Sequence, residues 1–220
     1  MRDLTDSVIV FYSGGKDSAV LLDLAVRHFK IVHPVFMYHV NGLSFQDTIL
    51  KWAEKKYGVE IYRVPHFELS TMYRSGAFSK ADRSVRQIKI NDIYAHARDA
   101  FGCEWIATGE RCADSTIRNA MIRKTGPIDA NRHRLYPLAY WLKSHVVSYI
   151  TQRKLMVSPE SKTLGHSFAG IVPKDLAKIK VEYPEDYQRI LSAFPLAEAA
   201  AIRHERTHEQ PGHQAPTGAG

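Results

Sequence analysis

Residues 7–26 read SVIVFYSGGKDSAVLLDLAV, and this stretch decides the fold. Its first part, Ser7 to Tyr12, is a short apolar run typical of a buried strand. Its last part has apolar residues at helical spacing, which predicts a helix over residues 18–29. In a parallel α/β sheet, the loop after the first strand lies at the carboxyl edge, and the next helix points its positive N-terminus into that edge. The polar loop SGGKDS is therefore expected to bind an anion.

Each residue of this loop suits the binding of phosphate groups. The loop consists of Ser13, Gly14, Gly15, Lys16, Asp17 and Ser18. The glycines have no Cβ, so consecutive backbone N–H groups can approach an anion closely. The serines add hydroxyl donors, the lysine adds a positive charge, and the aspartate can cap the helix or hold Mg²⁺. The loop matches neither GxxxxGK[ST] nor GxGxxG, so it belongs to neither of those phosphate-binding types.

Further apolar runs alternate with helical patterns along the chain. The patterns predict strands over residues 32–38, 60–64, 105–108 and 134–138, and helices over residues 45–57, 82–101 and 143–153. Strands separated by helices of this length are joined by right-handed crossovers. We therefore expect an α/β fold with a parallel five-stranded sheet, helices on both of its faces and a small C-terminal helical appendage.

The chain is expected to divide into three parts. Residues 1–170 form a nucleotide-binding domain, and residues 171–202 form a helical cap, because Pro173 and Pro184 each suit the first turn of a short helix. Residues 203–220 are rich in Gly, Pro, Gln and His without apolar periodicity, which predicts a disordered tail. The cap helices could also serve as the interface of a homodimer.

Composition narrows the classes of partner and cofactor. The chain has 220 residues, a formal net charge of +7 and two cysteines without CxxC spacing. The positive charge favours an anionic partner but does not separate a nucleotide, a nucleic acid and an acidic protein. The apolar run near the start is too short for a signal peptide or a membrane span, so we expect a cytoplasmic protein with no membrane partner. The cysteine count argues against both a zinc site and an iron–sulfur cluster.

Three segments carry a resemblance to a known family. SGGKDS resembles the SGGxDS signature of the PP-loop ATP pyrophosphatases, which are adenine nucleotide alpha hydrolase-like proteins. TGERCADSTIR, residues 108–118, and RLYPLAYWLKSHVVSYITQRKL, residues 134–155, are similar to segments of the phosphoadenosine phosphosulfate (PAPS) reductase-like branch. The resemblance covers most of residues 7–171. It implies that the protein binds ATP or PAPS with Mg²⁺, and that ATP is cleaved between the α and β phosphates.

The second segment adds residues to the expected site. It follows the strand predicted next to the first one, so Thr108, Gly109 and Arg111 reach the same sheet edge. A guanidinium at Arg111 can stabilise the charge that grows as pyrophosphate leaves, and Arg118 is a candidate second clamp. The alternative is that both arginines form surface ion pairs with Glu110 and Asp114. Catalysis is assigned to Lys16, Asp17 and Arg111.

The base of the nucleotide is expected at the end of the second strand, which reads MYHVNG. Family members usually carry an acidic residue and a glycine near this point, whereas this chain has His39, Asn41 and Gly42. Two interpretations follow. Either the base is bound mainly by backbone groups around residues 37–39, or the chain prefers a different nucleotide from the rest of the family. His39 is a candidate contact, and a structural role is the alternative.

The chain departs from the reductases in its sulfur chemistry. In GHSFAGIVP, residues 165–173, Ile171 stands where the family often has a cysteine. Cys112 lies beside Arg111, where cations could lower its pKa, but a small packed cysteine is the simpler interpretation. Reduction by a thiol pair of this chain is therefore disfavoured.

Three functions remain open after these observations. The first is an enzyme that adenylates an unknown acceptor and releases pyrophosphate, with the acceptor received by basic residues between positions 74 and 89. The second is a PAPS-binding or APS-binding enzyme that uses a thiol from a partner. The third is a non-catalytic module that binds a nucleotide or a nucleic acid.

Overall fold

The computed structural model describes residues 3–208. A six-stranded sheet lies at its centre, with strand order β3-β2-β1-β4-β6-β5. Its strands are β1 (Ser7–Phe11), β2 (Ile31–Tyr38), β3 (Tyr62–Pro65), β4 (Ile106–Ala107), β5 (Ile128–Asp129) and β6 (Arg134–Leu135). All pairings are parallel except the one between β5 and β6. The α/β fold is confirmed, and β5 is an additional antiparallel strand at the edge.

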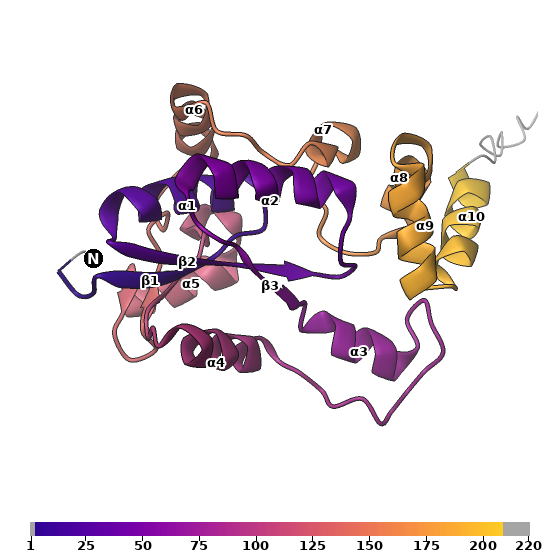
Figure 1. Ribbon diagram of the computed structural model, residues 1–220, viewed down its shortest axis with the longest axis horizontal. Helices are drawn as coiled ribbons and strands as arrows, with labels where there is room; N and C mark the ends of the chain where they lie inside the picture. Colours follow the sequence, from indigo (N-terminus) through magenta and orange to yellow (C-terminus); the bar gives the residue numbers. More distant parts are fainter. Residues whose placement is uncertain (1–2, 209–220) are drawn as a thin grey trace, which may run out of the picture.

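Helices cover both faces of the sheet. Along β1, Val8 and Val10 pack in the cluster that holds the apolar residues of α1 (Lys16–His28) and α2 (Ser44–Tyr57). Ile9, between them, packs instead with Ile93 of α4 (Ile90–Phe101). Successive side chains of a strand point to opposite faces, so a strand covered on both faces is apolar at every position. Figure 1 shows α1, α2 and α6 (Lys143–Arg153) on one side, with α4 and α5 (Thr116–Thr125) on the other.

The C-terminal helices form a second apolar cluster beyond the carboxyl ends of the strands (Figure 1). These helices are α8 (Pro173–Glu182), α9 (Pro184–Ala193) and α10 (Ala197–His208). They share their core with Leu43 and Phe45 at the start of α2. The buried carboxylate of Asp186 accepts hydrogen bonds from the backbone N–H of Ser44 at 2.8 and 2.9 Å. The cap is therefore fixed to the segment that follows β2.

The helices differ from the sequence-based expectation at two boundaries and by one additional helix, and the strands at β4 and β6 are shorter than expected. The helix expected over residues 82–101 begins at Ile90, because Arg74 holds the carbonyls of Arg83 and Val85 in a non-helical loop. A short helix α3 (Glu68–Ser75) precedes that loop. Helix α10 continues to His208, since it starts in the strong helix-forming run AEAAA, so the disordered tail does not begin at residue 203. Residues 209–220 of that expected tail lie outside the described residues.

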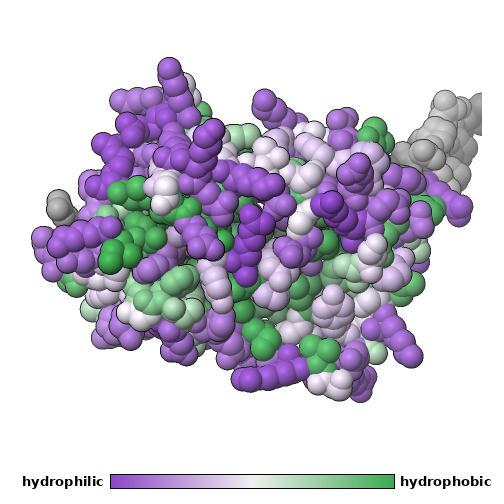
Figure 2. Space-filling view, in the orientation of Figure 1, coloured by the Kyte–Doolittle hydropathy of each residue, from purple (hydrophilic) through white to green (hydrophobic). Residues whose placement is uncertain are grey.

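Polar residues cover most of the face drawn in Figure 2, and apolar residues show on it only in small patches. Between residues 3 and 208, no helix combines the length and the apolar character needed to cross a bilayer. Two short elements complete the fold, a 3₁₀ turn (η1, Cys112–Asp114) and α7 (Glu160–Leu164). Both lie in segments that approach the loop after β1.

Candidate active site

The loop after β1 has the conformation that its glycines predict. Gly14 has a φ of +75°, a backbone conformation that residues other than glycine rarely adopt. A Cβ built on Gly14 would also lie only 3.0 Å from Cγ2 of Ile49, which is fully buried in α2. Gly15 is the N-cap of α1 in an extended conformation. Gly14 is thus required by backbone geometry and by close packing.

Three backbone N–H groups of the loop are free to bind an anion. The N–H of Ser13 donates to Oγ of Ser18 at 3.2 Å, and that hydroxyl donates to the Gly15 carbonyl at 2.9 Å. The N–H groups of Gly14, Gly15 and Lys16 have no hydrogen-bond partner within residues 3–208. They lie at the N-terminus of α1, where unpaired N–H groups and the helix dipole favour negative charge. This arrangement matches the expected phosphate site.

A buried arginine connects the loop after β4 to the start of α1. The residue Arg111 is 5% exposed, and its Nε lies 3.1 Å from Oδ1 of Asp17. Its Nη2 donates to Oδ1 of Asp114 at 2.6 Å. The remaining nitrogen, Nη1, is buried and has no hydrogen-bond partner among the described residues. Arg111 is therefore paired with Asp114, as the alternative expected, but it is buried beside the loop after β1. Of its three guanidinium nitrogens, only Nη2 forms a hydrogen bond within residues 3–208.

The other expected residues of this segment differ in how closely they approach the loop. Gly109 packs against α1, since a Cβ on it would lie 3.4 Å from the carbonyl carbon of Asp17. Thr108 is buried, and its hydroxyl donates to Oε2 of Glu110 at 3.2 Å. Arg118 has a side chain that is 48% exposed and lies 3.4 Å from Oδ2 of Asp114. Arg118 thus has a surface ion pair, and its role as a second clamp stays a prediction.

Asp17 faces two cations of the chain itself. Its Oδ2 accepts a hydrogen bond from Nζ of Lys16 at 2.7 Å, while Oδ1 faces Arg111. Mg²⁺ is a hard cation that prefers oxygen ligands and keeps several waters. A single carboxylate that already neutralises two cations does not fit a protein-based Mg²⁺ site. The assignment of Asp17 as a metal ligand stays a prediction that this arrangement does not support.

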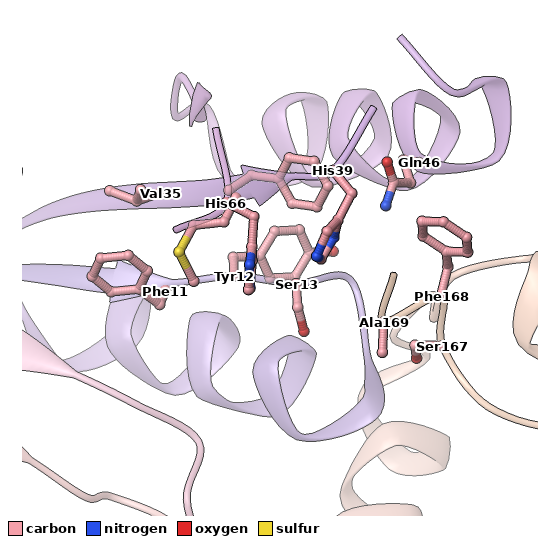
Figure 3. A pocket seen from close by; sticks show the side chains of 12 residues that line it. Phe11, Tyr12, Ser13, Val35, His39, Gln46, His66, Ser167, Phe168 and Ala169 are labelled. Atoms are coloured by element: carbon pink, nitrogen blue, oxygen red, sulfur yellow. The ribbon is translucent and has the colours of Figure 1, made fainter. Parts of the chain in front are cut away.

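A cavity of about 250 Å³ opens beside the loop, between the ends of β1, β2 and β3 (Figure 3). Its lining residues are Phe11, Tyr12, Ser13, Val35, Phe36, Met37, His39, Gln46, His66, Ser167, Phe168 and Ala169. Most of these side chains are apolar or aromatic. Sites for drug-sized ligands usually measure roughly 300–1,000 Å³, so this cavity suits one flat ring system and not a whole nucleotide.

His39 lines this cavity together with a second histidine that the sequence did not single out. The rings of His39 and His66 stack with centroids 4.2 Å apart, and Figure 3 shows them next to each other. Burial lowers the pKa of His39, although a hydrogen bond to Glu68 opposes the shift. Burial also lowers the pKa of His66, to about 4, and the neighbouring His39 adds to the shift. Both imidazoles are therefore neutral near pH 7.

The segment of residues 158–169 lines one side of the cavity and forms a hydrogen bond with the loop after β1. The N–H of Ser158 donates to the Gly14 carbonyl at 3.0 Å. The buried carboxylate of Glu160 accepts hydrogen bonds from the Ser158 hydroxyl and from the N–H of Phe168, which lines the cavity. Ser167 lies against Gly15, since its Oγ would be 3.0 Å from a Cβ there. Glu160 and Ser167 were not expected from the sequence, because only the folded chain brings residues 158–168 onto residues 13–15.

The two positions considered for sulfur chemistry both have packing contacts. Ile171 is 8% exposed and packs in the core shared with the cap helices. Cys112 is half-buried, and its N–H donates to the carbonyl of Ala139, beside which it packs. The position at which the reductases often have a cysteine therefore has a packing role in this chain.

Comparison with known proteins assigns the chain to a family. The family model of the phosphoadenosine phosphosulfate reductase domain matches residues 7–159, which is more than half of the chain. The comparison with curated proteins finds no relative that matches. The matched segment includes β1, the loop after it and Arg111.

Three solved structures are similar to the chain at low identity. The PAPS reductase of Candida auris, in a phosphate complex, is 17% identical over 71% of this chain and 77% of its own, with a TM-score of 0.47. The U34-tRNA thiolase of Methanococcus maripaludis, with its [4Fe-4S] cluster, is 15% identical over 96% and 74%, with a TM-score of 0.46. The NH₃-dependent NAD synthetase of Campylobacter jejuni is 13% identical over 96% and 90%, with a TM-score of 0.48. The family assignment rests on the family model and not on these likenesses.

One expectation is corrected by these comparisons. The cysteine count predicted a protein without an iron–sulfur cluster, but the similar tRNA thiolase carries a [4Fe-4S] cluster. The prediction was wrong, because it used the number of cysteines alone. That number concerns only the thiolate ligands that one chain can offer to a cluster. The prediction is withdrawn.

The motif after β1, the second motif after β4 and the family match agree with one another. Both motifs lie within the residues that the family model matches, and the fold places both at one edge of the sheet. The chain belongs to the phosphoadenosine phosphosulfate reductase domain family, within the PP-loop, adenine nucleotide alpha hydrolase-like class.

Proposed function

We propose that the protein binds ATP with its β and γ phosphates on Ser13–Ser18 and transfers AMP to an acceptor, releasing pyrophosphate. The observation that carries this proposal is the set of three unpaired N–H groups, of Gly14, Gly15 and Lys16, at the N-terminus of α1. Such a set binds an anion without any further rearrangement of the chain. The half-exposed ammonium of Lys16 stands at the same place.

The cavity beside the loop suits the other half of the nucleotide. Ser13 belongs to both the loop and the cavity lining, so a ligand can occupy both at once. The aromatic and apolar lining favours a flat base, and the neutral imidazole of His39 can exchange a hydrogen bond with a ring nitrogen. The base then lies by the end of β2, as expected from the sequence, and the α phosphate lies between the cavity and the loop.

The reaction follows from this placement. A nucleophilic atom of the acceptor forms a bond to the α phosphorus, and the bond from this phosphorus to the oxygen bridging to the β phosphorus breaks. The bonding electron pair leaves with pyrophosphate, and the acceptor's proton passes to solvent. Negative charge grows on the leaving group, where the loop N–H groups, Lys16 and the unused Nη1 of Arg111 stabilise it. Most of the rate enhancement then comes from positioning and charge stabilisation.

Product analysis tests the proposal. The protein is incubated with ATP and candidate acceptors, and the phosphorus-containing products are identified by ³¹P NMR. We expect pyrophosphate together with AMP or an adenylated acceptor, and loss of both products in Lys16→Ala. ADP with orthophosphate would contradict attack at the α phosphorus.

A second candidate function is supported by the family match itself, which is to a PAPS reductase domain. In this alternative the protein binds PAPS or APS, and a partner supplies the thiol, because Ile171 is buried at the position of the family's cysteine. Thermal shifts measured with ATP, PAPS, AMP and pyrophosphate distinguish the two. At equal ligand concentrations the nucleotide with the lowest Kd gives the largest shift, and a ligand at a hundred times its Kd stabilises the protein by about 2.7 kcal/mol.

A further inference from the structure

We propose that His39, His66 and Glu68 form a binding site for a divalent transition-metal ion, with Zn²⁺ as the best-fitting ion. The three side chains each offer one ligand atom, and these atoms lie within 4.8 Å of one another. Two imidazole nitrogens and one carboxylate oxygen are a ligand set that Zn²⁺ uses in sites with an open coordination position. The site shares His39 and the cavity with the base of the proposed nucleotide, but its test measures metal binding and needs no nucleotide.

The backbone holds the two histidines next to each other. His39 directly follows β2 and His66 directly follows β3, and the parallel register pairs Tyr38 with Pro65. The N–H of His66 donates to the Tyr38 carbonyl at 2.8 Å. The two residues therefore occupy adjacent places at the carboxyl edge of the sheet. Glu68 begins helix α3 two residues later, so it is fixed to the same edge.

The ligand atoms converge on one point. Oε2 of Glu68 lies 3.2 Å from Nε2 of His39 and 3.5 Å from Nδ1 of His66. In a tetrahedral site with metal–ligand distances near 2.1 Å, the ligand atoms are about 3.4 Å apart. Both measured separations are close to this value. A hydrogen bond between His39 and Glu68 accounts for the first distance without an ion, and the N–H of Glu68, which donates to Nδ1 of His66 at 3.3 Å, holds that nitrogen near the carboxylate. An ion at this site would take the lone pair of Nδ1 in place of that hydrogen bond.

The surroundings restrict the rings and leave room beside them. His66 is stacked between His39 and Phe67, with ring centroids 4.2 and 4.5 Å apart. Gly170, with a φ of +137°, approaches His39 so closely that a Cβ would lie 3.4 Å from its Nε2. A larger residue at this position would fill the space next to the proposed ligand nitrogen. The carboxylate side chain of Glu68 is 52% exposed, so an ion can enter from its side.

An ion at this site would have a coordination position open to a cavity. His39 and His66 line the 250 Å³ cavity, and His66 also lines a neighbouring cavity of about 620 Å³ between α3 and α4. Water or a donor atom of a small molecule can therefore supply the fourth ligand. Two nitrogen ligands disfavour Mg²⁺ and Ca²⁺, which prefer oxygen ligands.

Zinc binding by the full chain tests the proposal. The protein is treated with a chelator, dialysed, and titrated with Zn²⁺ in competition with a chromophoric chelator, while Co²⁺ reports the coordination number through its visible absorption. We expect one ion per chain. His66→Ala and Glu68→Gln should each weaken binding at least about a hundredfold, since removal of outer-shell partners alone costs 10–100-fold.

Two controls make the result decisive. His96→Ala removes a histidine that hydrogen-bonds to Tyr62 and does not belong to the proposed ligand set, and it should leave the affinity unchanged. The double variant His208→Ala/His213→Ala removes two histidines from the C-terminal end of the chain and should also leave it unchanged. Circular dichroism verifies the fold of each variant, and Glu68→Gln keeps the shape of the side chain at a half-exposed position. If folded Glu68→Gln and His66→Ala bind Zn²⁺ as tightly as the parent, or if the double variant abolishes binding, the proposal is overturned.

Discussion

At the carboxyl ends of β1 and β4, Lys16, Asp17 and Arg111 form a charged cluster, which we call the anion corner. At the ends of β2 and β3, His39 and His66 stack as two neutral rings beside Glu68, and we call this the histidine corner. Both corners belong to one edge of one sheet, and the cavity lined by the two histidines extends to Ser13 of the loop after β1.

The difference between the corners matches the two halves of a nucleotide. Unpaired N–H groups and cations stabilise negative charge at the anion corner, where phosphate groups would lie. Burial keeps the imidazoles uncharged at the histidine corner, where a flat base or a borderline metal ion would lie. One edge can thus hold a ligand that is charged at one end and flat at the other. The predictions below alter one corner at a time, in order of decreasing effect.

Arg111→Ala should cause the largest loss, because it leaves the carboxylates of Asp17 and Asp114 without their buried cation. Breaking a buried pair on one side costs about 3–5 kcal/mol, so we expect a loss of about 3 kcal/mol in the free energy of unfolding measured in urea. Arg118→Ala is the control, since its half-exposed pair with Asp114 contributes less than about 1 kcal/mol. Equal losses in the two variants would mean that the buried ion pairs of Arg111 stabilise the fold no more than a surface ion pair does.

Lys16→Ala should mainly lower activity. Removal of one group that stabilises the leaving pyrophosphate costs about 10²–10³-fold in turnover, by analogy with the loss of an oxyanion donor. The ion pair of Lys16 with Asp17 is half-exposed, so stability should change by less than about 1 kcal/mol. Lys51→Ala, at an exposed position of α2, is the matched control and should keep full turnover. Unchanged turnover in Lys16→Ala would remove the lysine from the reaction.

Gly14→Ala should destabilise the loop that carries the anion corner. A left-handed conformation costs a residue with a Cβ about 1–2 kcal/mol, which urea unfolding detects. The double variant Gly14→Ala/Ile49→Ala, compared with Ile49→Ala alone, tests the cause, because Ile49→Ala removes the Cγ2 atom of the 3.0 Å contact but does not change the backbone conformation at position 14. We expect Gly14→Ala to cost as much stability in the Ile49→Ala background as in the parent. A smaller cost would identify packing against Ile49 as the dominant constraint.

The sequence could bring the residues of the anion corner together, because that corner is mostly local; that they bind phosphate stays a prediction. Six consecutive residues and the start of one helix form it, and the helix spacing and glycine pair are visible in the chain. The placement of Arg111 also followed, since β4 pairs with β1. The sequence did not reveal that Asp17 is held between two cations, because that depends on side-chain packing between two segments about 94 positions apart.

The histidine corner and strand β5 at the sheet edge were harder to predict, because each depends on residues that are distant in the sequence. His66 and Glu68 follow a strand of only four residues, and no motif surrounds them. The one available signal was a histidine after each of two neighbouring parallel strands, and it becomes informative only once the strand order is known. Strand β5 has two residues, too few to show any alternation, and its pairing depends on the return of the chain to β6.

Glu68→Gln should have the smallest effect on stability and provides the sharpest test of whether the corners are independent. The His39–Glu68 pair involves a neutral imidazole and a half-exposed carboxylate, so its loss should change the free energy of unfolding by less than about 1 kcal/mol. Pyrophosphate binding, measured by calorimetry without metal, should be unchanged, because the phosphate donors lie at the other corner. Arg111→Lys is the matched variant at that corner, since it keeps the charge but loses the planar fork, and it should weaken pyrophosphate binding. If Glu68→Gln weakened pyrophosphate binding as much as Arg111→Lys, the two corners would form one continuous anion site, and the division into a phosphate end and a base end would fail.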